Sequence, residues 1–296
     1  MLNDEELKCA LDECNRKKVV PLIMTIAGII FTFISVVEFQ IAGAIVSFAV
    51  IVIGGILLSR VSKKKEKLIS ENVTIKVLSD VFNITEYDRD AHINEKVIRN
   101  TGLITSPWNV ISGSDYFRGS YRGVDITCSD VTLIEETTHT TDESTYTTTT
   151  VVFKGQWIIL KLRRAVNSRL IVKEKSEKLF GKGYQKVKSD FEVEDMAFNE
   201  QFQIKSKDGH EVFLILTPHF MEHIRLSDQK ANGRTGFCFM NDEAHFICYN
   251  DKDLFEIHGN MKDIGLLREN MVRETKYITD MIDELLENDY LFGTDF

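Results

Sequence analysis

The chain has 296 residues, 43% of them hydrophobic, and a formal net charge of −9, so it can form one or two folded units with a sizeable core. Nucleic acids attract basic surfaces, and we therefore expect no nucleic-acid binding from this acidic chain. The five cysteines are an odd number without a Cys-x-x-Cys pair. They offer no zinc ribbon and predict reduced, buried thiols, and the sequence predicts no cofactor.

Residues 1–18 are predicted to form a cytoplasmic amphipathic helix, because apolar residues recur at helical spacing and acidic residues come first. Residues 19–58 follow as an apolar run. As one helix this run would be about 60 Å long, at about 1.5 Å per residue, which is roughly twice the hydrocarbon thickness of a bilayer. It is therefore expected to form a transmembrane hairpin of two helices.

The turn of this hairpin is predicted at Glu38, Phe39 and Gln40. A carboxylate costs about 2.5–3.5 kcal/mol at the bilayer centre but little among headgroups, so Glu38 belongs at the tip. The alternative is a functional carboxylate buried within a membrane bundle. Small residues would let the two helices approach closely; they are Gly28, Gly43, Ala44, Gly54 and Gly55.

Basic residues flank the hairpin on both sides and orient it, so both termini of this multi-pass protein should be cytoplasmic. Arg16, Lys17 and Lys18 precede the first helix. The segment 59–90, predicted to be basic and then helical, supplies five more, namely Arg60, Lys63, Lys64, Lys65 and Lys67. These five are candidates for contact with lipid headgroups, at about 1 kcal/mol each, although a topology signal alone would explain them.

Residues 91–296 are predicted to form a cytoplasmic α+β domain of mainly antiparallel sheet with flanking helices. Segments rich in β-branched and aromatic residues indicate strands at 121–135, 145–162 and 169–175. The threonine tract at 137–150 indicates a long hairpin with a solvated face.

Two shorter hairpins are expected further along, one with its turn at Asp208-Gly209 and one with its turn at 241–244. A long C-terminal helix is predicted over 261–288, where apolar residues form a stripe. That stripe packs on the core of the domain or, alternatively, on a partner helix.

The most specific chemical motif is H-x-x-E-H, formed by His219, Glu222 and His223. On a helix this spacing places two zinc-binding histidines one turn apart, with a carboxylate that handles the proton of the attacking water. The two histidines lie opposite the apolar face of the predicted helix, however. No clear third ligand follows, although Glu243 and His245 stay open, so we favour surface histidines over a metal site.

Five stretches carry a family resemblance: VFKGQW (152–157), FE (191–192), FNEQF (198–202), ILTPHFME (215–222) and KDLFE (252–256). Together with two close membrane spans, they resemble the bacterial membrane-protein family called domain of unknown function 3137, over about residues 115–286. The Leu-Thr-Pro-x-Phe-Met-Glu box is the most specific part. The resemblance implies a bacterial cytoplasmic membrane address, variable residues at positions 219 and 223, and no established reaction.

The sequence thus predicts a membrane-tethered cytoplasmic binding, adaptor or sensor module with no favoured enzymatic role. Its expected partners are the lipid bilayer and another membrane or membrane-associated protein, and a homo-oligomer stays open. Two alternatives come from other classes: a zinc-dependent hydrolase that uses His219, Glu222 and His223, and an oligomeric channel or transport accessory subunit built from the membrane hairpin.

Overall fold

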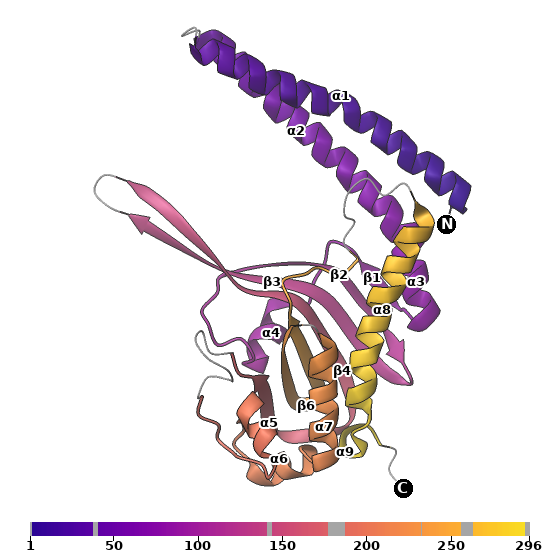
Figure 1. The fold of residues 1–296 in the computed structure, drawn as a ribbon, viewed down its shortest axis with the longest axis vertical. Helices are drawn as coiled ribbons and strands as arrows, with labels where there is room; N and C mark the ends of the chain where they lie inside the picture. The colour runs from indigo at the N-terminus through magenta and orange to yellow at the C-terminus, as the bar shows by residue number, and fades with distance from the viewer. Residues whose placement is uncertain are drawn as a thin grey trace. The chain divides into compact units, whose positions relative to one another are not determined.

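The computed structural model describes residues 2–37, 41–140, 144–176, 187–231, 233–255 and 263–293. The chain divides into two compact units, and Figure 1 labels their elements. The first consists of Met1–Val77 with Ile257–Met271, and the second of Leu78–Glu256 with Val272–Phe296. Helix α8, Ile264–Leu286, contributes residues to both.

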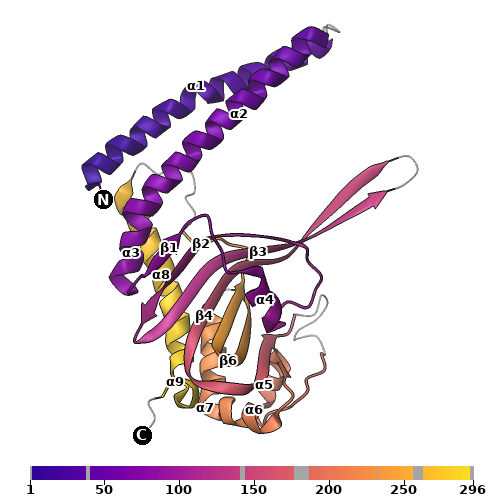
Figure 2. The ribbon, with the colours of Figure 1, turned by 180° about the vertical axis from the view of Figure 1, so that it is seen from behind.

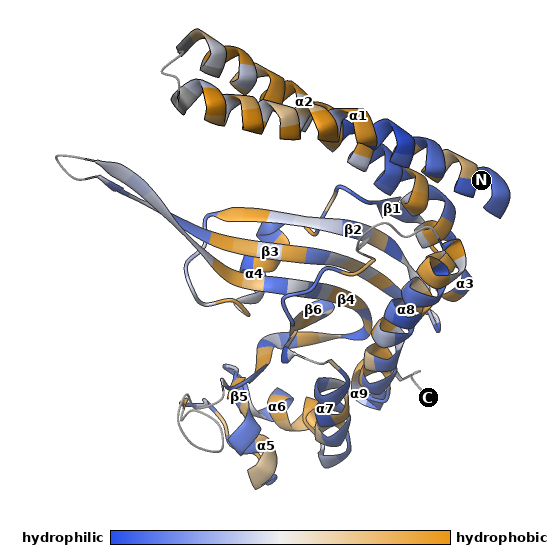
Figure 3. Ribbon diagram, turned by 45° about the horizontal axis from the view of Figure 1, so that its top comes forward, coloured by the Kyte–Doolittle hydropathy of each residue, from blue (hydrophilic) through white to orange (hydrophobic). Residues whose placement is uncertain are grey.

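Two long helices form most of the first unit: α1, Asp4–Val37, and α2, Ile41–Ile69. A π-helical turn, η1, Ser70–Thr74, and helix α3, Ile75–Val81, follow. Each long helix is apolar and long enough to cross a membrane, and Figure 3 shows hydrophobic residues along most of both. Two helices that could form the expected spans are therefore present. The expected turn residues Glu38, Phe39 and Gln40 lie outside the described residues.

Neither long helix ends where the sequence analysis placed a segment boundary, at residues 18 and 58. Helix α1 runs without a break from Asp4 to Val37, and α2 continues to Ile69. The reason is that both boundary stretches are rich in lysine and arginine, which are good helix formers, and contain no glycine. The expected N-terminal helix is thus the first part of α1, with Leu7 and Leu11 buried.

Small residues bring α1 and α2 together, as the sequence predicts. A Cβ added to Gly28 would lie 2.7 Å from a side chain of α2, and one added to Gly54 would lie 2.5 Å from a side chain of α1. Gly55, in contrast, has nothing within 4 Å of such a Cβ. The Thr32 hydroxyl donates to the Ser47 hydroxyl at 2.8 Å, which pairs the end of α1 with the start of α2 in an antiparallel hairpin.

The start of α8 is fixed to the other helices of the first unit by polar contacts. The Arg268 guanidinium contacts both carboxylate oxygens of Asp4, at 2.9 and 3.3 Å. The Thr74 hydroxyl donates to the Met271 sulfur at 3.5 Å. The first residues of α1, the π-helical turn and the first turns of α8 therefore form one packed cluster at the end of the membrane hairpin.

The second unit is built on one antiparallel sheet with the strand order β1-β2-β3-β4-β5, in which β6 also pairs with β4. The strands are β1 Glu86–Asp88, β2 Val110–Tyr121, β3 Val124–Thr140, β4 Thr145–Glu174, β5 Phe202–Lys205 and β6 Arg234–Tyr249. Strand β4 is 30 residues long and pairs with β3 in its first half and with β5 near its end. The predicted α+β architecture with antiparallel sheet is confirmed.

Helices cover both faces of this sheet, as the two views in Figures 1 and 2 show. They are α4 Glu95–Thr101, α5 Met196–Gln201, α6 Gly209–Ile215, α7 Pro218–Ala231, the second part of α8, and α9 Asp289–Phe292. Neighbouring residues of β6 show the two faces, because side chains alternate along a strand. Cys238 contacts the Thr101 carbonyl of α4, whereas Phe239 packs against Phe220 of α7, with ring centroids 6.0 Å apart.

Two of the three expected hairpins are wrong, and the third is confirmed. Residues 209–215 are helix α6, because the Asp208 carboxylate accepts hydrogen bonds from the His210 and Glu211 amides and caps a helix in place of a turn. Residues 241–244 lie within the continuous strand β6, where Asn241 adopts a φ of 53° at a bulge. The threonine tract does form a hairpin, in which Thr137 pairs with Thr148, and it projects from the sheet in Figure 1.

Candidate functional site

The histidine motif lies on α7, a helix that the sequence predicts. The Thr217 hydroxyl accepts a hydrogen bond from the Phe220 amide at 3.2 Å, and Pro218 is the first helical residue, so Thr217 caps the start of the helix. Phe220, Met221 and Ile224 are buried and form the expected apolar face. The motif therefore sits on a helix whose other side packs on the sheet.

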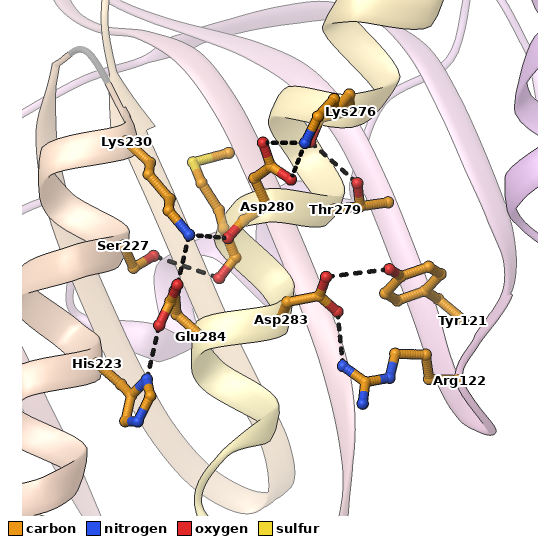
Figure 4. Close-up of polar contacts among 11 residues, drawn as sticks. Tyr121, Arg122, His223, Ser227, Lys230, Lys276, Thr279, Asp280, Asp283 and Glu284 are labelled. Carbon is orange, nitrogen blue, oxygen red and sulfur yellow. Dashed lines mark hydrogen bonds and ion pairs between the residues drawn. The ribbon is translucent and has the colours of Figure 1, made fainter.

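Of the three residues of the motif, His223 contacts Glu284 of α8, as Figure 4 shows. His223 Nδ1 lies 2.6 Å from Glu284 Oε2 on α8, and His223 Nε2 lies 3.2 Å from His219 Nε2. With neutral rings this chain of contacts requires Nδ1–H on His223 and Nε2–H on His219. Glu222 pairs instead with Arg225, so the carboxylate that a zinc hydrolase would use is engaged elsewhere.

Glu284 joins α7 to α8, because Lys230 of α7 also forms an ion pair with it. Burial raises the pKa of Glu284, but the hydrogen bonds from Lys230 and His223 outweigh this effect, and the net shift is downward. On the other side of α8, Asp283 accepts hydrogen bonds from Tyr121 at 3.3 Å and Arg122 at 2.9 Å. These contacts fix the second part of α8 within the second unit.

The other residues considered for a metal lie on β6. His245 Nδ1 accepts a hydrogen bond from the Trp157 indole at 3.3 Å, and its Nε2 lies 3.2 Å from a carboxylate oxygen of Glu243. Within the described ranges no group of three or more His, Cys, Asp or Glu side chains has the spacing of a metal site. The motif therefore has no visible third ligand in this part of the chain.

Two carboxylates that the sequence does not single out lie on neighbouring strands, the buried Asp130 on β3 and the half-buried Asp115 on β2. Asp130 accepts hydrogen bonds from the Gln156 side chain at 3.1 Å and from the Leu254 amide at 2.6 Å, and burial raises its pKa well above the ordinary value. Burial also raises the pKa of Asp115 to about 6, although a hydrogen bond from Tyr87 opposes the shift. Asp130 thereby holds the loop after β6.

A second carboxylate pair, the half-buried Glu174 and the buried Asp228, lies where β4 meets α7. Asp228 accepts hydrogen bonds from the Gln201 and Thr235 side chains, whereas Glu174 accepts one from the Thr235 amide at 3.2 Å. Burial and the neighbouring Asp228 raise the pKa of Glu174 to about 7. The hydrogen bond between the two side chains raises the pKa of Glu174 and lowers that of Asp228, which already has two other donors, so Glu174 is the better site for a proton in the protonated pair. Sequence reasoning missed this pair because its members are far apart along the chain.

An open cleft of about 710 Å³ lies in the second unit among β4, β5 and β6. Three cationic side chains line it, Arg169, Lys205 and Lys207, against one carboxylate, Asp190. No sequence motif marks this site, because its residues come from separate strands and from the irregular segment that follows Lys161 in β4. The spacing of Lys205 and Lys207 on either side of a serine is the one local signal.

The irregular part of β4 is held by a carboxylate from α6. Its pairing with β6 shifts register between Lys161 and Val166 and again before Leu170. The buried Glu211 carboxylate accepts hydrogen bonds from the Asn167 amide at 2.8 Å and from the Ser168 amide at 2.7 Å. Both of its oxygens are therefore engaged with the backbone that lines the cleft.

The five basic residues that are expected to contact lipid headgroups lie on α2. Arg60, Lys63, Lys64 and Lys67 are exposed, and Lys65 is half-buried. Lys67 lies 3.7 Å from Glu71. These residues follow the apolar part of α2, as the sequence indicates.

The family model described as a protein of unknown function (DUF3137) matches residues 151–286. Among solved structures, the crystal structure of the mycobacterial trehalose monomycolate transport factor A, TtfA, is similar with a TM-score of 0.35 and 10% sequence identity, over 74% of this chain and 95% of that chain. No curated protein matches. Residues 151–286 contain all five stretches that carry the resemblance, so this part of the chain matches the DUF3137 family of proteins of unknown function.

Proposed function

We propose that this chain is a membrane-tethered binding module, an adaptor or sensor that presents its second unit to a membrane-associated protein at the cytoplasmic surface. The observation that carries the proposal is the exposure of apolar side chains along α1 and α2. Phe33 and Ile45, for example, are 72% and 67% exposed. Such surfaces are stable in lipid rather than in water, and the same chain carries a folded sheet domain.

The orientation is supported by the positions of the basic residues. Burial lowers the pKa of Lys65 of α2, and repulsion from Lys18 of α1 lowers it further, so the two flanking basic groups lie at the same end of the antiparallel hairpin. Because positively charged flanks stay on the cytoplasmic side, this arrangement favours cytoplasmic placement of both ends of the hairpin. The second unit, which follows α2, would then be cytoplasmic.

A binding role fits the histidine motif better than hydrolysis does. The zinc hydrolase would require Glu222 to leave Arg225, and His219 and His223 to give up the contact between their Nε2 atoms. A tethered module needs no such rearrangement, because tethering raises the local concentration of its partner and lets a weak site act.

Orientation can be tested with the natural thiol of Cys9. Among the five cysteines Cys9 is exposed and the other four are buried, so Cys9 is the thiol that a maleimide should label. If Cys9 is cytoplasmic, a membrane-impermeant maleimide should reach it only after the membrane is permeabilised. A Cys9→Ser variant carrying Thr147→Cys on the hairpin should behave in the same way. Labelling of either thiol in intact cells would contradict the proposed cytoplasmic placement.

The binding role can be tested by affinity capture of the full chain from native membranes in mild detergent, with quantitative mass spectrometry. A protein recovered in stoichiometric amounts, and lost when the second unit is truncated, would support the adaptor role. Recovery of the chain alone at full stability would contradict it. Metal analysis of the same sample tests the hydrolase alternative.

A further inference from the structure

We propose that the cleft among β4, β5 and β6 binds an organic phosphate ester through Arg169, Lys205 and Lys207. This inference goes beyond the proposed function, because it concerns a small ligand of the second unit and requires no protein partner. It rests on the charge, the shape and the fixed backbone of the cleft.

The charge of the cleft contrasts with that of the chain, whose formal net charge is −9. Three cations face one carboxylate, Asp190, and none of the three forms an ion pair with another described residue. Arg169 Nη1 donates to the Asn100 carbonyl at 2.9 Å, which fixes one of the five N–H donors that a guanidinium carries. The excess positive charge matches a phosphate ester, which carries one to two negative charges.

The positive charge of the cleft also affects the pKa of a neighbouring lysine. Lys173 of β4 donates to the Leu103 carbonyl at 3.1 Å, and burial lowers its pKa. Repulsion from Arg234 and Lys205 lowers it further. An anion bound near Lys205 would relieve this repulsion, so the electrostatic environment favours occupation of the cleft by a negative group.

The cleft is too large for a bare anion. Its volume of about 710 Å³ falls in the range of about 300–1,000 Å³ that is usual for small-molecule sites. Val166, Ile171 and Met240 give it an apolar part, which would contact the organic body of a ligand. A soluble phosphate ester and a lipid headgroup share this chemistry.

The backbone of the cleft is already fixed before a ligand arrives. The Glu211 carboxylate binds the amides of Asn167 and Ser168, so the segment that carries Arg169 cannot relax freely. A fixed site loses less conformational entropy on binding than a mobile one. The Glu211 carboxylate thus acts on the backbone of the cleft.

The experiment uses the full chain in dodecyl maltoside micelles, which contain no phosphate. Calorimetric titration with sn-glycerol 3-phosphate measures binding of a soluble ester, and native mass spectrometry with added phosphatidylglycerol measures retention of a headgroup. The test variant is Arg169→Gln/Lys205→Gln. The matched control, Arg163→Gln/Lys96→Gln, removes the same charge from exposed residues outside the cleft.

We expect the test variant to bind at least one probe ten times more weakly than the unmodified chain, with the control unchanged. Loss of glycerol 3-phosphate binding identifies a soluble ester, and loss of one retained phosphatidylglycerol identifies a headgroup. Should the double variant fold poorly, Lys207→Gln, which changes an exposed side chain, should still weaken binding several-fold. Equal binding by the unmodified chain and these variants, or binding of neither probe, would overturn the proposal.

Discussion

Replacing Glu211 with alanine should destabilise the second unit by about 2–4 kcal/mol. The buried carboxylate accepts two backbone hydrogen bonds, at 2.7 and 2.8 Å, and a hydrogen bond to a charged group contributes about 1.5–3 kcal/mol. The full sum is reduced because the substitution also removes a buried charge and because water can reach the amide of Asn167, whose residue is exposed. Glu211→Gln keeps one good acceptor and should cost about half as much.

The measurement is urea unfolding of the full chain in dodecyl maltoside micelles, followed by tryptophan fluorescence. Both tryptophans of the chain, Trp108 and Trp157, are buried in the core of the second unit, so the signal reports that unit. Glu200→Ala on α5 removes an exposed carboxylate and should change the free energy of unfolding by less than about 0.5 kcal/mol. If Glu211→Ala resembled this control, the carboxylate would not hold the bulge of β4.

Three further predictions concern the buried carboxylate pair, the membrane hairpin and the histidine motif. The folded pKa of Glu174 is raised to about 7. Its stabilising contribution is therefore present below its unfolded pKa of about 4.5 and is lost as the pH rises through 7. Glu174→Gln should flatten the pH dependence of the free energy of urea unfolding in this window, and parallel curves for the two proteins would contradict the shift. In a chain that carries Thr32→Cys and Ser47→Cys, mild oxidation should form a disulfide between α1 and α2. Adding Gly54→Leu should lower the yield of this disulfide, because the leucine side chain would collide with α1, whereas adding Gly55→Leu should not. Equal yields would mean that close contact at position 54 does not matter. Treatment with a chelator should leave the thermal melting temperature unchanged, because both histidines of α7 are already paired, and a drop of several degrees would restore the metal hypothesis.

The apolar segments were the most predictable part of the chain. The length of the apolar run predicts the two long apolar helices α1 and α2, and the predicted stripe of the C-terminal helix is buried in α8, from Ile264 to Leu285. These features depend on the local pattern of hydrophobic residues, which the sequence displays directly. The positions of their ends were less predictable, because lysine-rich stretches continue a helix as readily as they end one.

The two wrong hairpin predictions came from residues that are common in two different local structures. Asp208 followed by glycine is a common hairpin turn, but aspartate is also a strong helix N-cap, and here burial of Val212 and Ile215 on one helical face decides for α6. Asn241 tolerates a positive φ, which suits a turn or a bulge equally. The long partner strand β4 decides for the bulge, and that pairing is not visible in a local window.

The cleft and the buried carboxylates were not predictable for the same reason. Arg169 and Lys205 come from two strands that lie apart in sequence, and Glu174 meets Asp228 only when β4 packs near α7. Their chemistry follows from burial and from proximity. Neither property belongs to a residue before the chain has folded.

The pairing of the threonine hairpin also predicts that fast and slow amide hydrogen exchange alternate along its strand. Along residues 126–133, β3 lies between β2 and β4, so amides that point to either side are hydrogen-bonded. From Thr137 to Thr140 the described pairing of β3 is with β4 alone, and in an antiparallel pair only alternate residues direct their amides to the partner. Deuterium should therefore enter every second position of this stem quickly and the positions between them slowly, whereas the part of β3 inside the sheet should exchange slowly throughout.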